Sequence, residues 1–121
     1  MLPTARDANL IATVSATPEA PGTATVIATD NKFNRGSVGG AVTGAPFTVT
    51  FKNNGKVPHN IHFLDKKGGS DVAKGAAGAI INGGESATLT FTVAAAGNYY
   101  YQCDVHPDQM SGTLTVNDGA K

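Results

Sequence analysis

The sequence has little of several residue types, and each shortage excludes a class of protein. Its 121 residues contain one cysteine, Cys103, which excludes an internal disulfide, a four-cysteine zinc site and an iron–sulfur cluster held only by cysteines. Nine basic residues balance nine acidic ones, so the net charge of zero gives no electrostatic case for nucleic acid as a partner. No apolar run approaches the roughly 20 residues that a membrane-spanning helix needs. We therefore expect one domain with no membrane span and no nucleic-acid partner.

The remaining composition is typical of a small all-β protein. Short stretches rich in Val, Ile, Thr, Phe and Tyr are separated by turn-forming residues, and they predict strands over residues 23–28, 47–53, 60–64, 86–93, 99–103 and 112–116. In the fourth of these stretches, apolar residues alternate with Ser and Thr, which indicates that one face packs on a core. The sequence predicts a β-sandwich of about seven or eight strands with at most one short helix.

Three other segments carry weaker predictions. Residues 1–22 are rich in Ala, Thr and Pro, so we expect a linker or a loosely attached first strand, followed by a single domain over residues 23–121. Residues 68–78, with Ser70 as a possible N-cap, are the one helical candidate. The glycine-rich stretch 36–44 is expected to be a flexible turn region.

A cluster of metal-ligating residue types lies where a predicted strand ends. Cys103, His106 and Met110 fall within eight residues and offer a thiolate, an imidazole and a thioether. A fourth ligand has to come from elsewhere in the chain, and the candidates are His59 and His62. Because these two lie three residues apart along a predicted strand, they face opposite sides and only one would reach the same ion.

The position of His59, directly after Pro58 and at a sheet end, suits the fourth ligand, and His62 is otherwise expected to be an exposed strand residue. Two histidines and a thiolate with a weak axial methionine form the ligand set of electron-transfer copper sites. Thiolate and imidazole also suit zinc, so the ligand types alone leave both metals open.

The chain resembles the cupredoxins, the blue-copper family that includes plastocyanin, amicyanin and pseudoazurin. The resemblance spans residues 23–117 and is carried by Pro-His-Asn at 58–60, by Gly-Gly-Glu-Ser before the stretch 88–91, and by the segment from Tyr99 to Thr113. It implies a cupredoxin-like Greek-key β-sandwich that binds one type 1 copper ion. It also implies the strong ligands His59, Cys103 and His106, the axial ligand Met110, and Asn60 as the residue that ties the two ligand segments together. Gln109, next to Met110, is the alternative axial group.

The resemblance implies a blue-copper electron-transfer protein that cycles between Cu(II) and Cu(I) and is not an enzyme. Electron donors and acceptors would dock weakly and transiently near His106, on an apolar rim that includes Val105 and Pro107. It further implies a monomer in the periplasm or another extracytoplasmic compartment, with a membrane tether as one form of a longer precursor.

Other functions fit the sequence less well. A copper-binding carrier or sensor, or a detached domain of a larger redox protein, is the main alternative, because the first 22 residues look like a tether. A multicopper oxidase or nitrite reductase is excluded, because only His62 remains after His59 and His106 to build a catalytic copper site. A thiol nucleophile at Cys103 and an immunoglobulin-like adhesion domain both leave Met110 unexplained.

Overall fold

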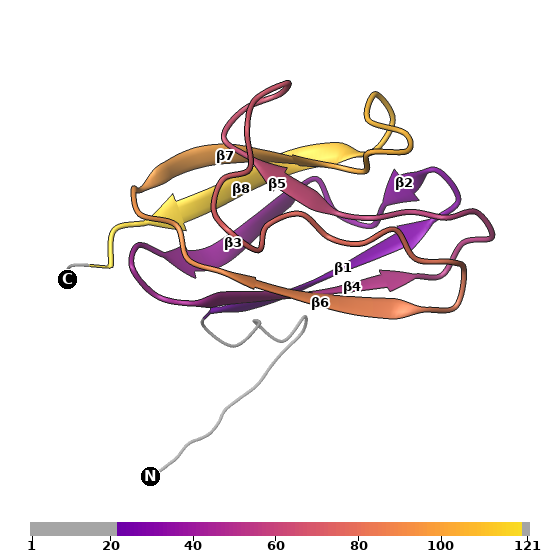
Figure 1. Cartoon of the computed structure of the whole chain (residues 1–121), viewed down its shortest axis with the longest axis horizontal. Coiled ribbons are helices and arrows are strands. Elements are labelled where there is room, and N and C mark those ends of the chain that lie inside the picture. Colours follow the sequence, from indigo (N-terminus) through magenta and orange to yellow (C-terminus); the bar gives the residue numbers. More distant parts are fainter. Residues whose placement is uncertain (1–21, 120–121) are drawn as a thin grey trace, which may run out of the picture.

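The computed structural model describes residues 22–119, which fold into two four-stranded sheets packed face to face (Figure 1). Their order is β2-β1-β4-β6 in one sheet and β3-β8-β7-β5 in the other. The strands are β1 (Thr23–Thr29), β2 (Lys32–Phe33), β3 (Ser37–Val42), β4 (Phe47–Asn53), β5 (His62–Leu64), β6 (Ser86–Phe91), β7 (Gly97–Gln102) and β8 (Ser111–Asn117). The prediction of an all-β sandwich with seven or eight strands is confirmed.

Both sheets mix parallel and antiparallel pairs. β1 and β4 run parallel in the first sheet, as β3 and β8 do in the second, and every other paired neighbour is antiparallel. The end of β7 and the start of β8 lie at the same end of the sandwich, so the loop with Cys103, His106 and Met110 lies there. His59 comes from a different segment, which precedes β5.

The core lies between the sheets and is built from alternating apolar residues. Every second residue of β4 is buried, which is the period-2 pattern that its sequence predicted. Aromatic rings fill the centre, where the ring of Phe63 lies 5.0 Å from that of Phe91 and 5.4 Å from that of Tyr101 between ring centroids. The hydroxyl of Tyr101 donates a hydrogen bond of 2.9 Å to the carbonyl of Arg35. These contacts make a rigid platform beneath the end of β7.

The expectation of a flexible turn over residues 36–44 is wrong. Ser37–Val42 form β3, which pairs in parallel with β8 with a register shift between Val38 and Ala41. Its sequence, SVGGAV, has low strand propensity because glycine lacks a side chain to pack. The strand forms because β8 supplies a hydrogen-bonding edge, and because Val38 and Ala41 are buried against the core.

The helical candidate at residues 68–78 is not a helix. It is an irregular segment that runs beside β5, and its backbone makes isolated bridges there, including Leu64 with Asp71 and His62 with Ala77. Gly68 and Gly75 have φ values of 77° and 90°, and such left-handed residues interrupt a right-handed helix. Among the described residues no helix is long and apolar enough to cross a membrane. The linker or first strand predicted for residues 1–22 lies outside the described residues except for Gly22.

Candidate metal centre

Three of the predicted ligands converge at one end of the sandwich. One ligand atom from each of His59, Cys103 and His106 lies within 4.8 Å of the other two. His59 and Cys103 are fully buried, and His106 is half-buried. Within residues 22–119 this is the one such group of three or more His, Cys, Asp or Glu side chains.

The end of β7 and the loop that follows it position Cys103 and His106. Cys103 directly follows β7, and its backbone N–H donates to the carbonyl of Met110 over 2.9 Å. The N–H groups of His106 and Met110 donate to the carbonyls of Cys103 and His106, over 3.2 and 3.0 Å. These three backbone bonds close the loop into tight turns, so the thiol and the imidazole are held at fixed positions relative to β7 and β8. Met110 is fully buried at the end of this loop.

A short backbone bridge outside the two sheets holds His59. Its N–H donates to the carbonyl of Ile81 over 3.0 Å, and the N–H of Ile81 donates to the carbonyl of His59 over 2.9 Å. This pairing aims the ring at the Cys103 loop, where its Nδ1 lies 3.7 Å from the Cys103 sulfur. The rings of His59 and His106 lie 5.3 Å apart between centroids.

The buried polar atoms of this cluster fit a bound metal ion. The ring atoms His106 Nδ1 and His59 Nε2 are buried and have no hydrogen-bond partner among the described residues. Burial lowers the pKa of His59, a backbone contact with Asp30 opposes this effect, and His106 lowers the pKa further. A neutral imidazole is the form that binds a metal, so the protonation state agrees with the geometry. A thiolate with two imidazoles suits a thiophilic ion such as copper or zinc.

Asn60 forms hydrogen bonds that link the segment of His59 to the segment of Cys103. Its side-chain amide donates to the carbonyl of Gly78 and to the Asp104 carboxylate, each over 3.0 Å. Its side-chain oxygen accepts the backbone N–H of Asp104 over 2.8 Å. Since Asn60 follows His59 and Asp104 follows Cys103, these bonds fix the distance between the two ligand residues.

His62 is a strand residue in β5, as expected, but it is half-buried and not exposed. Its side chain is 17% exposed, and its two ring nitrogens contact the carboxylates of Asp71 and Asp104. The argument that only one of the two histidines reaches the cluster agrees with the structure, since His62 is not among the three converging residues. The missed signal was the pair of aspartates, which lie 9 and 42 residues away in the sequence and approach only in the folded chain.

Comparisons with known proteins agree with this geometry. Residues 28–117 match the family described as copper binding proteins, plastocyanin/azurin family. Over 74 residues the chain is 39% identical to the chloroplastic plastocyanin of Oryza sativa subsp. indica. The aligned region covers 58% of this chain and 47% of that protein. The chain thus spans about half the length of the curated relative that it matches.

Two solved structures illustrate the range of the structural likeness. Auracyanin A from Chloroflexus aurantiacus, described as a "blue" copper protein, superposes with a TM-score of 0.66 at 25% identity, covering 81% of this chain and 100% of that one. Lac15 from a marine microbial metagenome has a TM-score of 0.61 at 15% identity, covering 84% of this chain but 33% of that one. The second likeness concerns the fold alone.

Proposed function

The chain belongs to the plastocyanin/azurin family of copper-binding proteins, and from that premise we propose that it is a type 1 blue-copper electron-transfer protein. The observation that carries the proposal is the convergence of His59, Cys103 and His106 within 4.8 Å. When bound, one copper ion supplies a one-electron couple between Cu(II) and Cu(I). The polypeptide supplies a set of ligands whose positions the two sheets hold.

His59, Cys103 and His106 would hold the copper ion as strong ligands, and Met110 would supply a further, weaker sulfur ligand. Met110 is fully buried at the end of the loop, whereas Gln109, the alternative axial group, is exposed. Cys103 would bind as a thiolate and the histidines through neutral rings, because those are the forms with free lone pairs. The buried Nδ1 of His106 and the Nδ1 of His59 near the Cys103 sulfur support this assignment.

The contribution of the chain to electron transfer is rigidity. The backbone bonds within the Cys103 loop, the bridge between His59 and Ile81, and the three bonds of Asn60 all hold ligand residues in place without a metal. A site that moves little between two oxidation states exchanges electrons quickly, because little energy is spent on rearrangement.

The electron would enter and leave through the half-buried His106 at an apolar surface. Val105, beside His106 in the sequence, is 42% exposed. Val57 and Ile80 are also exposed, and they flank the two sides of the bridge that holds His59. A neutral chain has no net charge to steer its encounters, so weak apolar docking of redox partners at this end is consistent with the composition.

Electron self-exchange between two copies tests the docking surface without a known partner. We expect Val105→Asp to slow self-exchange by about tenfold, because two such copies meet with like charges at the contact. Val42→Asp is the matched control, since Val42 is 36% exposed and pairs with Asn117 at the far end of β8. Equal rates in the two variants would rule out docking beside His106.

A module of a larger redox protein, or a copper carrier or sensor, is the second candidate. It is favoured by the fold occurring in Lac15, where the match covers 33% of a longer chain. An enzyme is disfavoured by the described part of the chain, because both ring nitrogens of His62 face carboxylates and cannot help to build a second copper site. Analysis of the full-length gene product for further domains separates a carrier from a module.

We further propose an extracytoplasmic, periplasm-like location and a monomeric state. The family supports the location, and a neutral net charge is consistent with partners that dock only transiently. Fractionation of cells that express the full-length product and light scattering of the purified chain test these two points. A cytoplasmic pool or a stable dimer would contradict them.

A visible absorption spectrum after addition of stoichiometric Cu(II) tests the whole proposal. We expect an intense thiolate-to-copper charge-transfer band that ascorbate bleaches and that Cys103→Ala lacks. Val42→Asp is the control, because Val42 is exposed and pairs with Asn117 at the far end of β8, and it should keep the band. A colourless protein that holds Zn(II) instead, or no metal, would refute electron transfer.

A further inference from the structure

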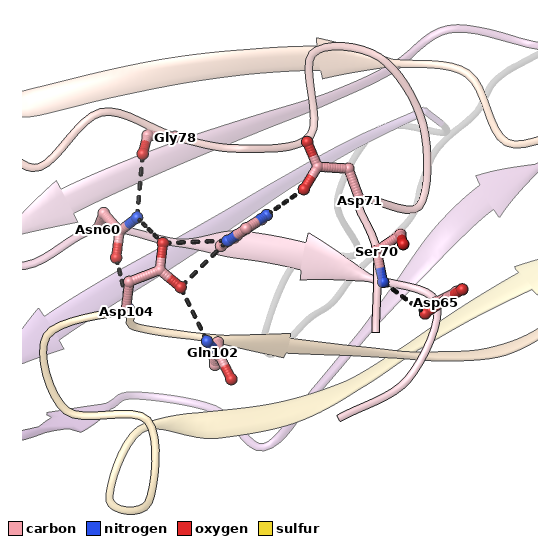
Figure 2. Close-up of polar contacts among 8 residues, drawn as sticks. Asn60, Asp65, Ser70, Asp71, Gly78, Gln102 and Asp104 are labelled. Atoms are coloured by element: carbon pink, nitrogen blue, oxygen red, sulfur yellow. Dashed lines mark hydrogen bonds and ion pairs between the residues drawn. The ribbon is translucent and has the colours of Figure 1, made fainter. Parts of the chain in front are cut away.

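A histidine with a carboxylate on each side lies next to the metal centre and outside it. The Nδ1 of His62 lies 3.1 and 3.0 Å from the two carboxylate oxygens of Asp104, and its Nε2 contacts a carboxylate oxygen of Asp71 (Figure 2). The three residues come from three segments: β5, the irregular segment 65–81, and the loop that follows Cys103. His62 therefore connects the ligand loop to two neighbouring segments.

The arrangement defines the charge of the imidazole. An ionised carboxylate only accepts hydrogen bonds, and a neutral imidazole donates through one nitrogen alone. Because both ring nitrogens of His62 face carboxylate oxygens, the arrangement is satisfied when both nitrogens carry protons. The ring is then an imidazolium, and each of its bonds is a charge-assisted hydrogen bond.

Asp104 is the residue through which this charge reaches the ligand loop. Its carboxylate also accepts hydrogen bonds from Gln102 over 2.8 Å and from Asn60 over 3.0 Å, and its own N–H donates to Asn60 (Figure 2). The side chain and the backbone of Asp104 are thus both held, and its neighbour Cys103 is held with it. Without the imidazolium, this carboxylate would be an uncompensated negative charge one residue from the thiolate.

We propose that His62 is a positioning residue of the metal centre, acting as an imidazolium bridge from Asp71 to Asp104 that holds the Cys103 loop in place and neutralises its carboxylate. The inference rests on the proposed function, because it concerns the same centre. It has two consequences: the loop stays ordered without a metal, and the reduced form of the loaded protein is favoured, since a compensated carboxylate does not stabilise the extra positive charge of Cu(II).

The first test uses the copper-free protein and amide hydrogen exchange at Asp104. In His62→Gln we expect this amide to exchange at least about tenfold faster, because a charge-assisted bond that limits local opening is lost. Asp71→Asn and Asp65→Asn form a matched pair, since both remove one carboxylate charge from the same segment. Asp71 contacts His62, whereas Asp65 accepts only the N–H of Ser70, over 3.0 Å, among the contacts drawn in Figure 2.

We expect faster exchange at Asp104 in Asp71→Asn and unchanged exchange in Asp65→Asn. This milder pair also decides the question should His62→Gln fail to fold. Equal exchange in Asp71→Asn, Asp65→Asn and the unmodified chain would overturn the bridge.

The second test is the reduction potential of the copper-loaded protein. At a fixed solution potential, His62→Gln should raise the ratio of oxidised to reduced protein by roughly threefold or more. Lys67→Gln is the charge-matched control, because Lys67 faces Asp108 of the same loop at 3.9 Å but is 70% exposed, so that solvent screens it. An equal ratio in the two variants would overturn the electrostatic role. If the unmodified chain shows no thiolate-to-copper band after copper is added, that result would instead refute the proposed function.

Discussion

Replacing Asn60 by alanine is the sharpest perturbation of the metal centre that leaves all four assigned ligands in place. The change removes three hydrogen bonds: from the amide to Gly78 and to the Asp104 carboxylate, and from the Asp104 N–H to the amide oxygen. Asn60 is 2% exposed, so water cannot replace these bonds without entering the structure. The two ligand segments then lose their direct link.

The size of the effect follows from the kinds of bond lost. The two bonds between neutral groups contribute about 1 kcal/mol each, and the bond to the partly exposed Asp104 carboxylate contributes about 1.5 kcal/mol. We therefore expect the copper-free protein to lose about 3 to 4 kcal/mol of unfolding free energy, against about 5 to 15 kcal/mol for a typical domain. Copper affinity should fall by about 10- to 100-fold, as is common when residues that orient metal ligands are removed.

Denaturant unfolding of the copper-free protein measures the first quantity, and competition with a copper chelator measures the second. Asn53→Ala is the matched control, because Asn53 is equally buried and also makes three hydrogen bonds, to Val57, Ile81 and Gly55. It should cost about 3 kcal/mol of stability. Because Asn53 supports one ligand segment and does not link the two, copper affinity should change by less than about threefold in this variant.

The reasoning fails if Asn60→Ala and Asn53→Ala lower copper affinity equally. It also fails if Asn60→Ala loses less than about 1 kcal/mol of stability, since the bonds would then carry little of the energy assigned to them. Should Asn60→Ala not fold, Asn60→Ser, which keeps a short polar group at this position, is measured in its place.

Three further changes have expected outcomes that unfolding measurements check. Gly112→Ala should lower the unfolding free energy by about 2 to 3 kcal/mol, because its Cβ would lie 2.4 Å from the Tyr101 ring. Gly39→Ala is the control, with nothing within 4 Å of its Cβ, and should lower it by less than about 1 kcal/mol. Equal losses would disprove the contact. Phe63→Ala should cost about 3 to 5 kcal/mol, because its buried ring packs on two others, and a loss under about 1 kcal/mol would contradict this packing. Burial lowers the pKa of His62, but its contacts with Asp71 and Asp104 together raise it by more, so the pKa lies above its usual value of 6.5. The stability that His62 contributes is therefore complete below pH 6.5 and is lost as the pH rises through the raised pKa. The stability difference between the unmodified chain and His62→Gln should shrink over that rise, and a difference that grows would refute the sign.

The strands that the sequence predicted well are those with strong local patterns. The stretch 47–53 became β4 with the predicted bounds, because its alternation matches one buried face. The stretch 60–64 shortened to β5 at His62–Leu64, because the carbonyl of Ile61 accepts the N–H of Gly78 in the irregular segment and not that of a sheet strand. The glycine-rich stretch that became β3 had no such pattern, and its strand depends on the edge that β8 offers.

Part of the metal centre could be predicted from residues close together in the sequence, and part depended on residues far apart. The spacing of Cys103, His106 and Met110 indicated a ligand loop, because a strand end followed by a tight turn brings such neighbours together. The position after Pro58 already favoured His59 over His62, and the structure then shows the His59 ring beside the Cys103 sulfur. The partners of His62 could not be read from the sequence, because nothing local joins it to residues 9 and 42 positions away.

The sequence by itself determined the all-β class, the inward faces of the main strands and the ligand types, because these follow from side-chain period and from chemistry within a few residues. The folded chain was needed to show that the His59 ring meets Cys103, that Asn60 hydrogen-bonds across to Asp104, and that His62 lies between two carboxylates. Those outcomes depend on contacts between segments that the packing of two sheets brings together, and no local interaction encodes their distance or direction.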